Sequence, residues 1–229
     1  MNILCTICMR ANSQEIKNKN LTIINGKPLM YYTINAAIKS KIFDEIIVSS
    51  DSKKIQREAK KLGAKVIFTR PKNLSSNDVP KLKAIQHALI ESENHFQKKF
   101  HLIFDLDVTA PLRDSNDIKK ALFKFKQTRS EMLVSVSRSK KNPYFNMLEK
   151  VSGKIEISKK TTRIVNSRQK SPLVYDMNAA IYIWKRNKLL RSQKIISDNL
   201  SIYEMPQEKS VDIDSRLDLK IAKMLLKSQ

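Results

Sequence analysis

Two pairs of aspartates are the first candidates for chemistry in this sequence. Asp105 and Asp107 lie at the end of an expected buried strand, and Asp212 and Asp214 repeat the same spacing near the end of the chain. Residues two apart in an extended segment face the same side, so each pair should bring two carboxylates together. Carboxylates bind Mg²⁺, which also binds substrate phosphates. The pairs predict a shared magnesium site; alternatively, Asp214 caps the last helix and Asp212 pairs with a lysine.

A polar loop after the first expected strand is the second candidate. It runs from Arg10 to Asn20 and is rich in amides, hydroxyls and basic side chains. Such a loop at the carboxyl end of a strand can hold a polyphosphate with backbone N–H groups, an arginine and a lysine. The alternative is an ordinary solvated loop. The chain has only three glycines, which excludes the glycine-rich loops of dinucleotide-binding and P-loop proteins.

The cysteines and histidines offer little chemistry. Cys5 and Cys8 form a C-x-x-C pattern, but it lies inside an expected strand and has no further metal ligands nearby in sequence. We interpret both as small buried residues. His87 and His101 have no serine or cysteine nucleophile in their sequence context, so a hydrolytic triad is not supported.

The net charge suggests nucleic acid as a partner, but the distribution of the charge does not. The chain has 44 Lys+Arg against 22 Asp+Glu, a formal charge of +22, and 33 of the basic residues are Lys. Nucleic-acid binding uses clustered Arg and Lys, often interleaved with aromatic residues. Here the lysines are spread over expected helix faces, so we interpret most of the charge as solvated and do not expect nucleic acid as a partner. With no bilayer-length apolar stretch and no signal peptide, we expect a cytoplasmic protein and no membrane partner.

The apolar pattern predicts an α/β fold, a Rossmann-like, mostly parallel sheet with helices on both faces. In such sheets ligands bind beyond the carboxyl ends of the strands, where both candidate sites fall. Expected strands span residues 3–9, 45–49, 65–68, 101–106, 132–136 and 181–184, and expected helices about 26–40, 51–63, 79–96, 115–127 and 214–226. Within the second helix, the Asp51–Ser52 region offers the N-cap and Gly63 the C-terminal stop, while Ser115 is expected to cap the fourth.

The pattern changes after Arg138. Residues 139–176 carry turn formers and short strand-like pieces such as 154–157. We interpret this stretch as a β-rich excursion from the sheet, a flap or a dimerisation element. The simplest account is one domain over residues 1–229 with this insertion.

Taken together and in order, the motifs resemble the acylneuraminate cytidylyltransferases, the family of CMP-sialic acid synthetases and relatives that act on bacterial nonulosonic acids. Residues 105–107 and 142–145 look most like the CMP-legionaminic acid synthetase branch. The matching segments are 10–13 with 17–21, 25–29, 48–51, 70–76, 107–113, 168–182 and 212–214.

This resemblance implies a single nucleotidyltransferase domain that transfers CMP from CTP to the anomeric hydroxyl of a 2-keto sugar acid and releases pyrophosphate, with Mg²⁺ as cofactor. It also implies a homodimer in which 139–176 contributes to the neighbouring site. Arg10, Lys19, Asp212 and Asp214 would be catalytic. The implied nucleotide-binding residues are Arg10, Asn12, Ser13, Lys19, Arg70 and Ser76; the sugar-binding residues Asp107, Arg168, Gln169 and Tyr182; and the metal ligands Asp107, Asp212 and Asp214.

One departure from the family pattern supports a second hypothesis. Family loops usually place a lysine and a glycine after the serine, where this chain has Gln14 and Glu15. Losing one electrostatic donor from a transition state costs on the order of 3 kcal/mol, or roughly a hundredfold in rate. Unless Lys17 replaces the missing lysine, the chain would be a nucleotide-binding relative of these enzymes with impaired catalysis. A nucleic-acid-binding module, resting on charge alone, is the third hypothesis.

Overall fold

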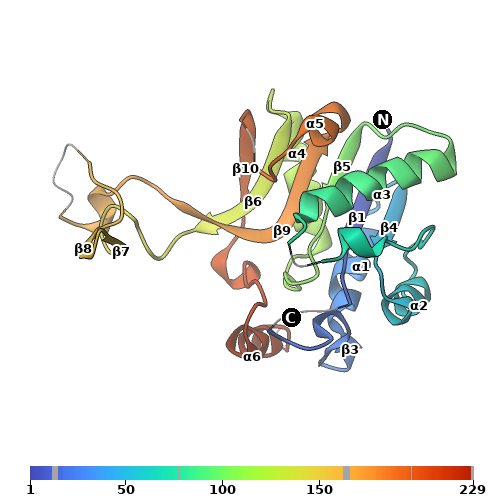
Figure 1. Cartoon of the computed structure of the whole chain (residues 1–229), viewed down its shortest axis with the longest axis horizontal. Coiled ribbons are helices and arrows are strands. Elements are labelled where there is room, and N and C mark those ends of the chain that lie inside the picture. The colour runs from blue at the N-terminus through green and yellow to red at the C-terminus, as the bar shows by residue number, and fades with distance from the viewer. Residues whose placement is uncertain (12–14, 77, 162–165, 197, 228–229) are drawn as a thin grey trace.

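A six-stranded sheet forms the centre of the protein, in the order β10-β6-β9-β5-β1-β4 (Figure 1). The structure is a computed structural model that describes residues 1–11, 15–76, 78–161, 166–196 and 198–227. Neighbouring strands are parallel except around β9, which is antiparallel to both β5 and β6. The strands are β1 (Ile3–Cys8), β4 (Glu45–Ser49), β5 (Leu102–Asp105), β6 (Met132–Arg138), β9 (Tyr175–Lys185) and β10 (Leu200–Glu204). The expected mostly parallel α/β fold is confirmed.

Helices cover both faces of this sheet because its strands are apolar on both sides. Along β1, Ile3, Cys5 and Ile7 pack into one cluster with α1, α2 and α4, while Leu4 packs into a second cluster with α3. Burying both faces of parallel strands is what the βαβ arrangement requires. The helices are α1 (Leu29–Ser40), α2 (Lys53–Lys61), α3 (Lys81–Phe96), α4 (Ser115–Lys126), α5 (Arg186–Arg191) and α6 (Arg216–Leu225).

Helix ends follow local capping chemistry, with two corrections. The hydroxyl of Ser52 accepts from the N–H of Ile55 at the start of α2, and Gly63 follows its end at φ +91°, both as expected. The cap of α4 is Asp114 rather than Ser115, because Asp114 forms a reciprocal capping box with Asp117. The cap of α6 is Ser215, so Asp214 is not the capping residue.

Three strand expectations need revision. The expected strand 65–68 is wrong: its described pairing is a single bridge between Ile47 and Lys65. The strand expected at 181–184 is longer, β9 beginning at Tyr175. The short strands β2 (Ile23–Ile24) and β3 (Lys27–Pro28), the helix α5 and the strand β10 were not expected; β10 is paired in parallel with β6.

Residues 139–161 and 166–174 belong to an arm that extends from the sheet between β6 and β9 (Figure 1). Its centre is the antiparallel hairpin β7 (Leu148–Val151) and β8 (Lys154–Ile157), the second of which matches the expected piece. The arm exposes several large apolar side chains, with Leu148 65% and Ile155 63% exposed. The predicted β-rich excursion is therefore observed.

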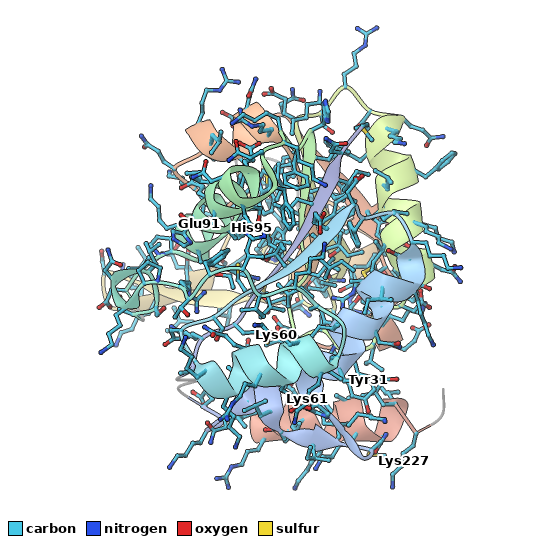
Figure 2. All side chains as sticks on the ribbon, turned by 90° about the vertical axis from the view of Figure 1, so that its right-hand side faces the viewer. Tyr31, Lys60, Lys61, Glu91, His95 and Lys227 are labelled. Atoms are coloured by element: carbon cyan, nitrogen blue, oxygen red, sulfur yellow. The ribbon has the colours of Figure 1, made fainter. Side chains whose placement is uncertain are left out.

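Surface lysines account for much of the net charge. Lys60 and Lys61 lie on the exposed side of α2, and Lys227 lies beyond α6, all pointing away from the core (Figure 2). Among the described residues, no helix combines the length and hydropathy needed to cross a membrane.

A buried ion-pair cluster at the end of α3 generates a prediction about stability. Arg186 donates from Nε (2.7 Å) and Nη2 (2.8 Å) to Glu93, which also accepts from Lys99 and from the N–H of Phe100. Burial alone would raise the pKa of Glu93, but these hydrogen bonds outweigh it and hold the pKa at about 2. Glu93→Gln should lower the free energy of unfolding by about 3 kcal/mol, because it removes one member of a buried charge cluster.

The lowered pKa of Glu93 also fixes how its contribution to stability changes with pH. A carboxylate whose folded pKa is depressed stabilises the fold above its unfolded pKa, and this contribution disappears as pH falls toward the folded value. The stability difference between wild type and Glu93→Gln, measured by urea unfolding, should therefore shrink from pH 5 toward pH 2. The control is Glu91→Gln on the same helix, whose side chain is 41% exposed. An equal effect of both variants contradicts the prediction.

Candidate functional site

The sheet register brings several distant segments to one edge. Cys8 pairs with Ser49 across β1 and β4, and Thr6 pairs with Asp105 across β1 and β5. The chain segments that follow these three parallel strands therefore leave the sheet on the same side, where ligands of α/β proteins bind. A cavity of about 530 Å³ lies there. Its lining is Cys8, Met9, Arg10, Glu15, Lys19, Asn20, Arg70, Leu74, Ser75, Ser76, Val79, Pro80, Lys81, Ala84, Asp107, Thr109, Asp212 and Asp214.

Arg70 anchors the wall of this cavity. Its Nη2 donates to the carbonyl of Met9 (2.7 Å), and its Nε donates to Ser75 Oγ (3.1 Å). Asp51 lies 3.8 Å from the same Nη2 and accepts from the N–H of Ala11 (2.9 Å). The guanidinium is only 5% exposed, so Arg70 holds the loops after β1 and β4 together while also lining the cavity.

Lys19 joins the two ends of the chain across the cavity. Its Nζ donates to the carbonyl of Ile213 (2.7 Å) and to Asp214 Oδ1 (3.2 Å). The N–H of Ile213 in turn donates to the carbonyl of Thr109 (2.8 Å). These contacts place the second aspartate pair beside the loop after β5, as the sequence pattern predicted for a shared site.

The carboxylates of the two pairs are not equivalent. Asp107, Asp212 and Asp214 line the cavity, but Asp105 is fully buried behind it, where Thr6 Oγ1 donates to its Oδ1 (2.8 Å). The expectation that both aspartates of the first pair face one shared site is therefore wrong for Asp105. The two carboxylates nevertheless converge on Lys81 Nζ, as their spacing predicted, and Asp105 differs from Asp107 in lying deeper.

Asp212 has the features of an incomplete ligand site. Its Oδ1 is buried and has no hydrogen-bond partner among the described residues. Burial raises the pKa of Asp212 to about 6, although the hydroxyl of Thr109 donates to the carboxylate and opposes that rise. In the described part of the chain, no three His, Cys, Asp or Glu side chains gather closely enough to hold a metal ion unaided.

The sequence reasoning missed Lys81, which lies inside the site. Its Nζ is 2.6 Å from Asp105 Oδ2 and 2.6 Å from Asp107 Oδ2. Burial would lower the pKa of Lys81, but the two carboxylates outweigh it and raise the pKa, so the side chain is a cation. The sequence signal was weak, since Lys81 and Lys83 look alike at the start of a lysine-rich helix.

Other expected residues fall outside the cavity lining. Arg168 and Gln169 are exposed in a short 3₁₀ turn, η3 (Arg168–Lys170), on the arm. Tyr182 is 7% exposed, with its ring stacked on Trp184 and 5.7 Å from Lys81 Nζ. Lys17 is exposed and does not line the cavity, whereas Glu15 does. The expected residues Asn12 and Ser13, and with them Gln14, lie outside the described residues.

The two cysteines are free thiols in the described structure. Cys5 is buried, as expected, and Cys8 is partly buried and reaches the cavity wall. Burial raises the pKa of both thiols, and the charge of Asp105 raises it further. Both therefore remain protonated near neutral pH, which excludes thiolate chemistry.

The fold and the polar cavity of mixed charge at the carboxyl ends of the strands mark a ligand-binding α/β protein. A family model described as cytidylyltransferase matches residues 4–228. Post-translational flagellin modification protein B of Campylobacter coli is 40% identical over 227 residues, covering 99% of this chain and 96% of that protein. CMP-N,N'-diacetyllegionaminic acid synthase of Campylobacter jejuni is 41% identical over 224 residues, covering 98% and 94%.

A solved structure gives the same fold. CMP-2-keto-3-deoxy-manno-octonic acid synthetase, complexed with CTP, superimposes with a TM-score of 0.72 at 14% identity, covering 100% of this chain and 99% of that one. The chain belongs to the cytidylyltransferase family. The resemblance seen in the collinear motifs is confirmed, and so is the expected class of enzyme.

The contacts of Lys19 generate a prediction about the segment around Asp212. Lys19→Met should free this segment, since it removes a charge-assisted hydrogen bond worth about 1.5 kcal/mol. Hydrogen exchange at the amide of Ile213, which donates to Thr109, should then become roughly tenfold faster. Lys17→Met is the matched control and should leave this exchange unchanged. Unchanged exchange in Lys19→Met rejects the role of Lys19 as the link.

Proposed function

We propose that this protein transfers CMP from CTP to the anomeric hydroxyl of a nonulosonic acid, with N,N'-diacetyllegionaminic acid as the first candidate. The observation that carries the proposal is the 41% identity, nearly end to end, with CMP-N,N'-diacetyllegionaminic acid synthase. The mixed charge of the cavity supports it, because both substrates are anions that need cations and hydrogen-bond donors. The use of CTP supports a cytoplasmic reaction.

In the proposed reaction the sugar hydroxyl oxygen attacks the α-phosphorus. The bond to the bridging oxygen breaks, pyrophosphate leaves, and the hydroxyl loses its proton. Arg10, Lys19 and the loop containing Asn12 and Ser13 are proposed to hold the triphosphate. The developing charge on the pyrophosphate is then met by preorganised cations, the largest contribution in most such reactions. Arg10 and Lys19 both line the cavity, which supports this assignment.

The base and the sugar are assigned to different walls. Ser76 and Arg70 are proposed to lie beside cytosine, with Arg70 acting mainly by shaping the wall, since its guanidinium already contacts Met9, Ser75 and Asp51. Asp107 is proposed to accept a hydrogen bond from the sugar acid. Tyr182 supports the sugar side from behind, because its ring lies near Lys81 rather than on the cavity surface.

Mg²⁺ is the proposed cofactor, and Asp212 and Asp214 are its proposed ligands. The residues fit: Asp212 offers a buried carboxylate oxygen without a hydrogen-bond partner, and Asp214 is 75% exposed at the cavity rim. Mg²⁺ is commonly held by one or two carboxylates, waters and substrate phosphates rather than by a complete protein cage. When bound it would neutralise charge on the triphosphate. Asp107, which lines the cavity and contacts Lys81, is the proposed third ligand.

We further propose a homodimer in which the arm of one protomer completes the cavity of the other. Arg168 and Gln169, the proposed partners of the sugar carboxylate and hydroxyls, do not line their own chain's cavity. The arm also exposes apolar surface that a second protomer would cover. Its exposed apolar residues include Met147, Leu148, Val151, Ile155 and Leu173.

The reaction can be tested directly by following pyrophosphate release. The protein is incubated with CTP, Mg²⁺ and, in turn, N,N'-diacetyllegionaminic acid, N-acetylneuraminic acid and 3-deoxy-manno-octulosonic acid. We expect the highest kcat/KM with the first. Adding EDTA should abolish turnover and excess Mg²⁺ should restore it, because without the cation Asp212 and Asp214 would repel the triphosphate. Asp212→Asn should lower turnover about a hundredfold. No release above blank with any sugar acid overturns the proposal.

The same assay distinguishes an active enzyme from the alternative of a catalytically impaired nucleotide-binding relative. Glu15 favours that alternative because it lines the cavity. That alternative predicts CTP binding by calorimetry without turnover. The double variant Gln14→Lys, Glu15→Gly should then gain activity, since it adds a cation and removes an anion near the proposed triphosphate position. Efficient turnover by the wild type eliminates this alternative.

Dimers mixed from two inactive variants test whether the arm of one protomer completes the cavity of the other. Arg168→Ala and Asp212→Asn should each lose most activity alone. Mixed in equal amounts with subunit exchange, half of the dimers are heterodimers with one intact site, so roughly a quarter of the wild-type activity should return. The control mixes Lys19→Met with Asp212→Asn, which lie in one chain's cavity and should not complement. No recovery in the first mixture, despite exchange shown by mass spectrometry, rejects an arm that works in trans.

A further inference from the structure

Lys81 is the first residue of α3 and reaches across to the loop after β5. Its Nζ contacts Asp105 Oδ2 and Asp107 Oδ2, each at 2.6 Å, and its side chain is 27% exposed at the cavity wall. Asp105 is fully buried, so its carboxylate depends on this ammonium and on the hydroxyl of Thr6 for compensation. Lys81 is therefore a structural part of the cavity wall and not a solvated surface lysine.

The backbone of Asp107 is fixed independently of Lys81. Its carbonyl accepts from Thr33 Oγ1 (3.1 Å) and from Arg113 Nη1 (3.2 Å), two residues that lie beneath the loop. Its side chain is held by the N–H of Val108 at Oδ1 (2.9 Å) and by Lys81 at Oδ2 (2.6 Å). An ionised carboxylate can accept about four hydrogen bonds, so each oxygen keeps capacity for a ligand in the cavity.

The charge of the described cavity lining depends on the same lysine. Arg10, Lys19, Arg70 and Lys81 oppose Glu15, Asp107, Asp212 and Asp214, and Asp105 lies directly behind Lys81. Without Lys81, the Asp105–Asp107 pair would lose the ammonium that contacts both carboxylates, and the carboxylate of Asp107 would face an anionic substrate. Such repulsion is stronger at a partly buried site than in bulk water.

We propose that Lys81 is a positioning residue for the sugar acid, which acts by holding the Asp107 carboxylate in its binding direction and by compensating the Asp105–Asp107 pair. The inference rests on the proposed function, because it assigns Asp107 to the sugar side of the cavity. Lys81 links the wall formed by α3 to the loop after β5, so it determines where that acceptor lies. The nucleotide is held mainly by the loop after β1, on other residues.

The test compares the effect of Lys81 variants on the KM for the sugar acid with their effect on the KM for CTP. Lys81→Met should raise the KM for N,N'-diacetyllegionaminic acid at least about tenfold, the loss expected when a charge-assisted contact is removed. The KM for CTP should change by less than about twofold. Lys81→Arg, which keeps the cation, should recover most of the loss. The matched control is Lys83→Met, an exposed lysine on the same helix, which should behave as the wild type.

A double-mutant cycle tests the route through Asp107. Asp107→Asn alone should raise the sugar-acid KM, and adding Lys81→Met should change it by less than about twofold further, because the residue through which Lys81 acts is already altered. If Lys81→Met fails to fold, Lys81→Met combined with Asp105→Asn removes the uncompensated buried charge and should show the same KM split. Additive effects, an equal rise in the KM for CTP, or no recovery in Lys81→Arg each overturn the inference.

The two levels of the proposal fail differently. A wild type that releases no pyrophosphate with any sugar acid overturns the proposed function and this inference with it. A wild type that turns over, while Lys81→Met keeps its sugar-acid KM, overturns the inference alone.

Discussion

The parallel pairing of β1 with β4 on one side and β5 on the other is the constraint on which the site depends. It aligns Cys8 with Ser49 and Thr6 with Asp105, so the loops after all three strands emerge at one edge. The strands can pair this way because both of their faces are apolar and covered by helices. A register shift would move Asp105 out of reach of Thr6 and would separate the loop anchored by Arg70 from the one that carries Asp107.

At this edge of the sheet, basic and acidic side chains are paired, so the cavity does not carry charges of one sign only. Lys19 is paired with Asp214, Arg70 with Asp51, and Lys81 with two aspartates. Paired cations are held in fixed directions, and preorganised charges of this kind can stabilise developing charge without reorganisation. The same pairing ties the last helix to the first loop, since Lys19 reaches the carbonyl of Ile213. Binding geometry and the closure of the fold thus rest on the same contacts.

Much of the architecture could be predicted from the sequence, and the failures have physical causes. The strands at β1, β4, β5 and β6 were found because continuous apolar runs bounded by polar residues mark buried parallel strands. The segment 65–68 has the same apolar character, yet it makes only one bridge, because pairing depends on a partner and not on composition. Residues 200–204 lacked periodicity but pair with β6, whose edge was available.

For the site, the sequence by itself determined which chemical groups are present and their order along the chain. Spacing and collinear motifs identified the polar loop, Arg70 and the aspartate pairs, because these features are local. Only the tertiary structure decided which groups face the cavity. It turned Asp105 inward, brought Lys81 between two carboxylates, and left Arg168 on an arm away from its own cavity. Those outcomes depend on contacts between residues far apart in sequence, whose distances are set by packing and not by spacing along the chain.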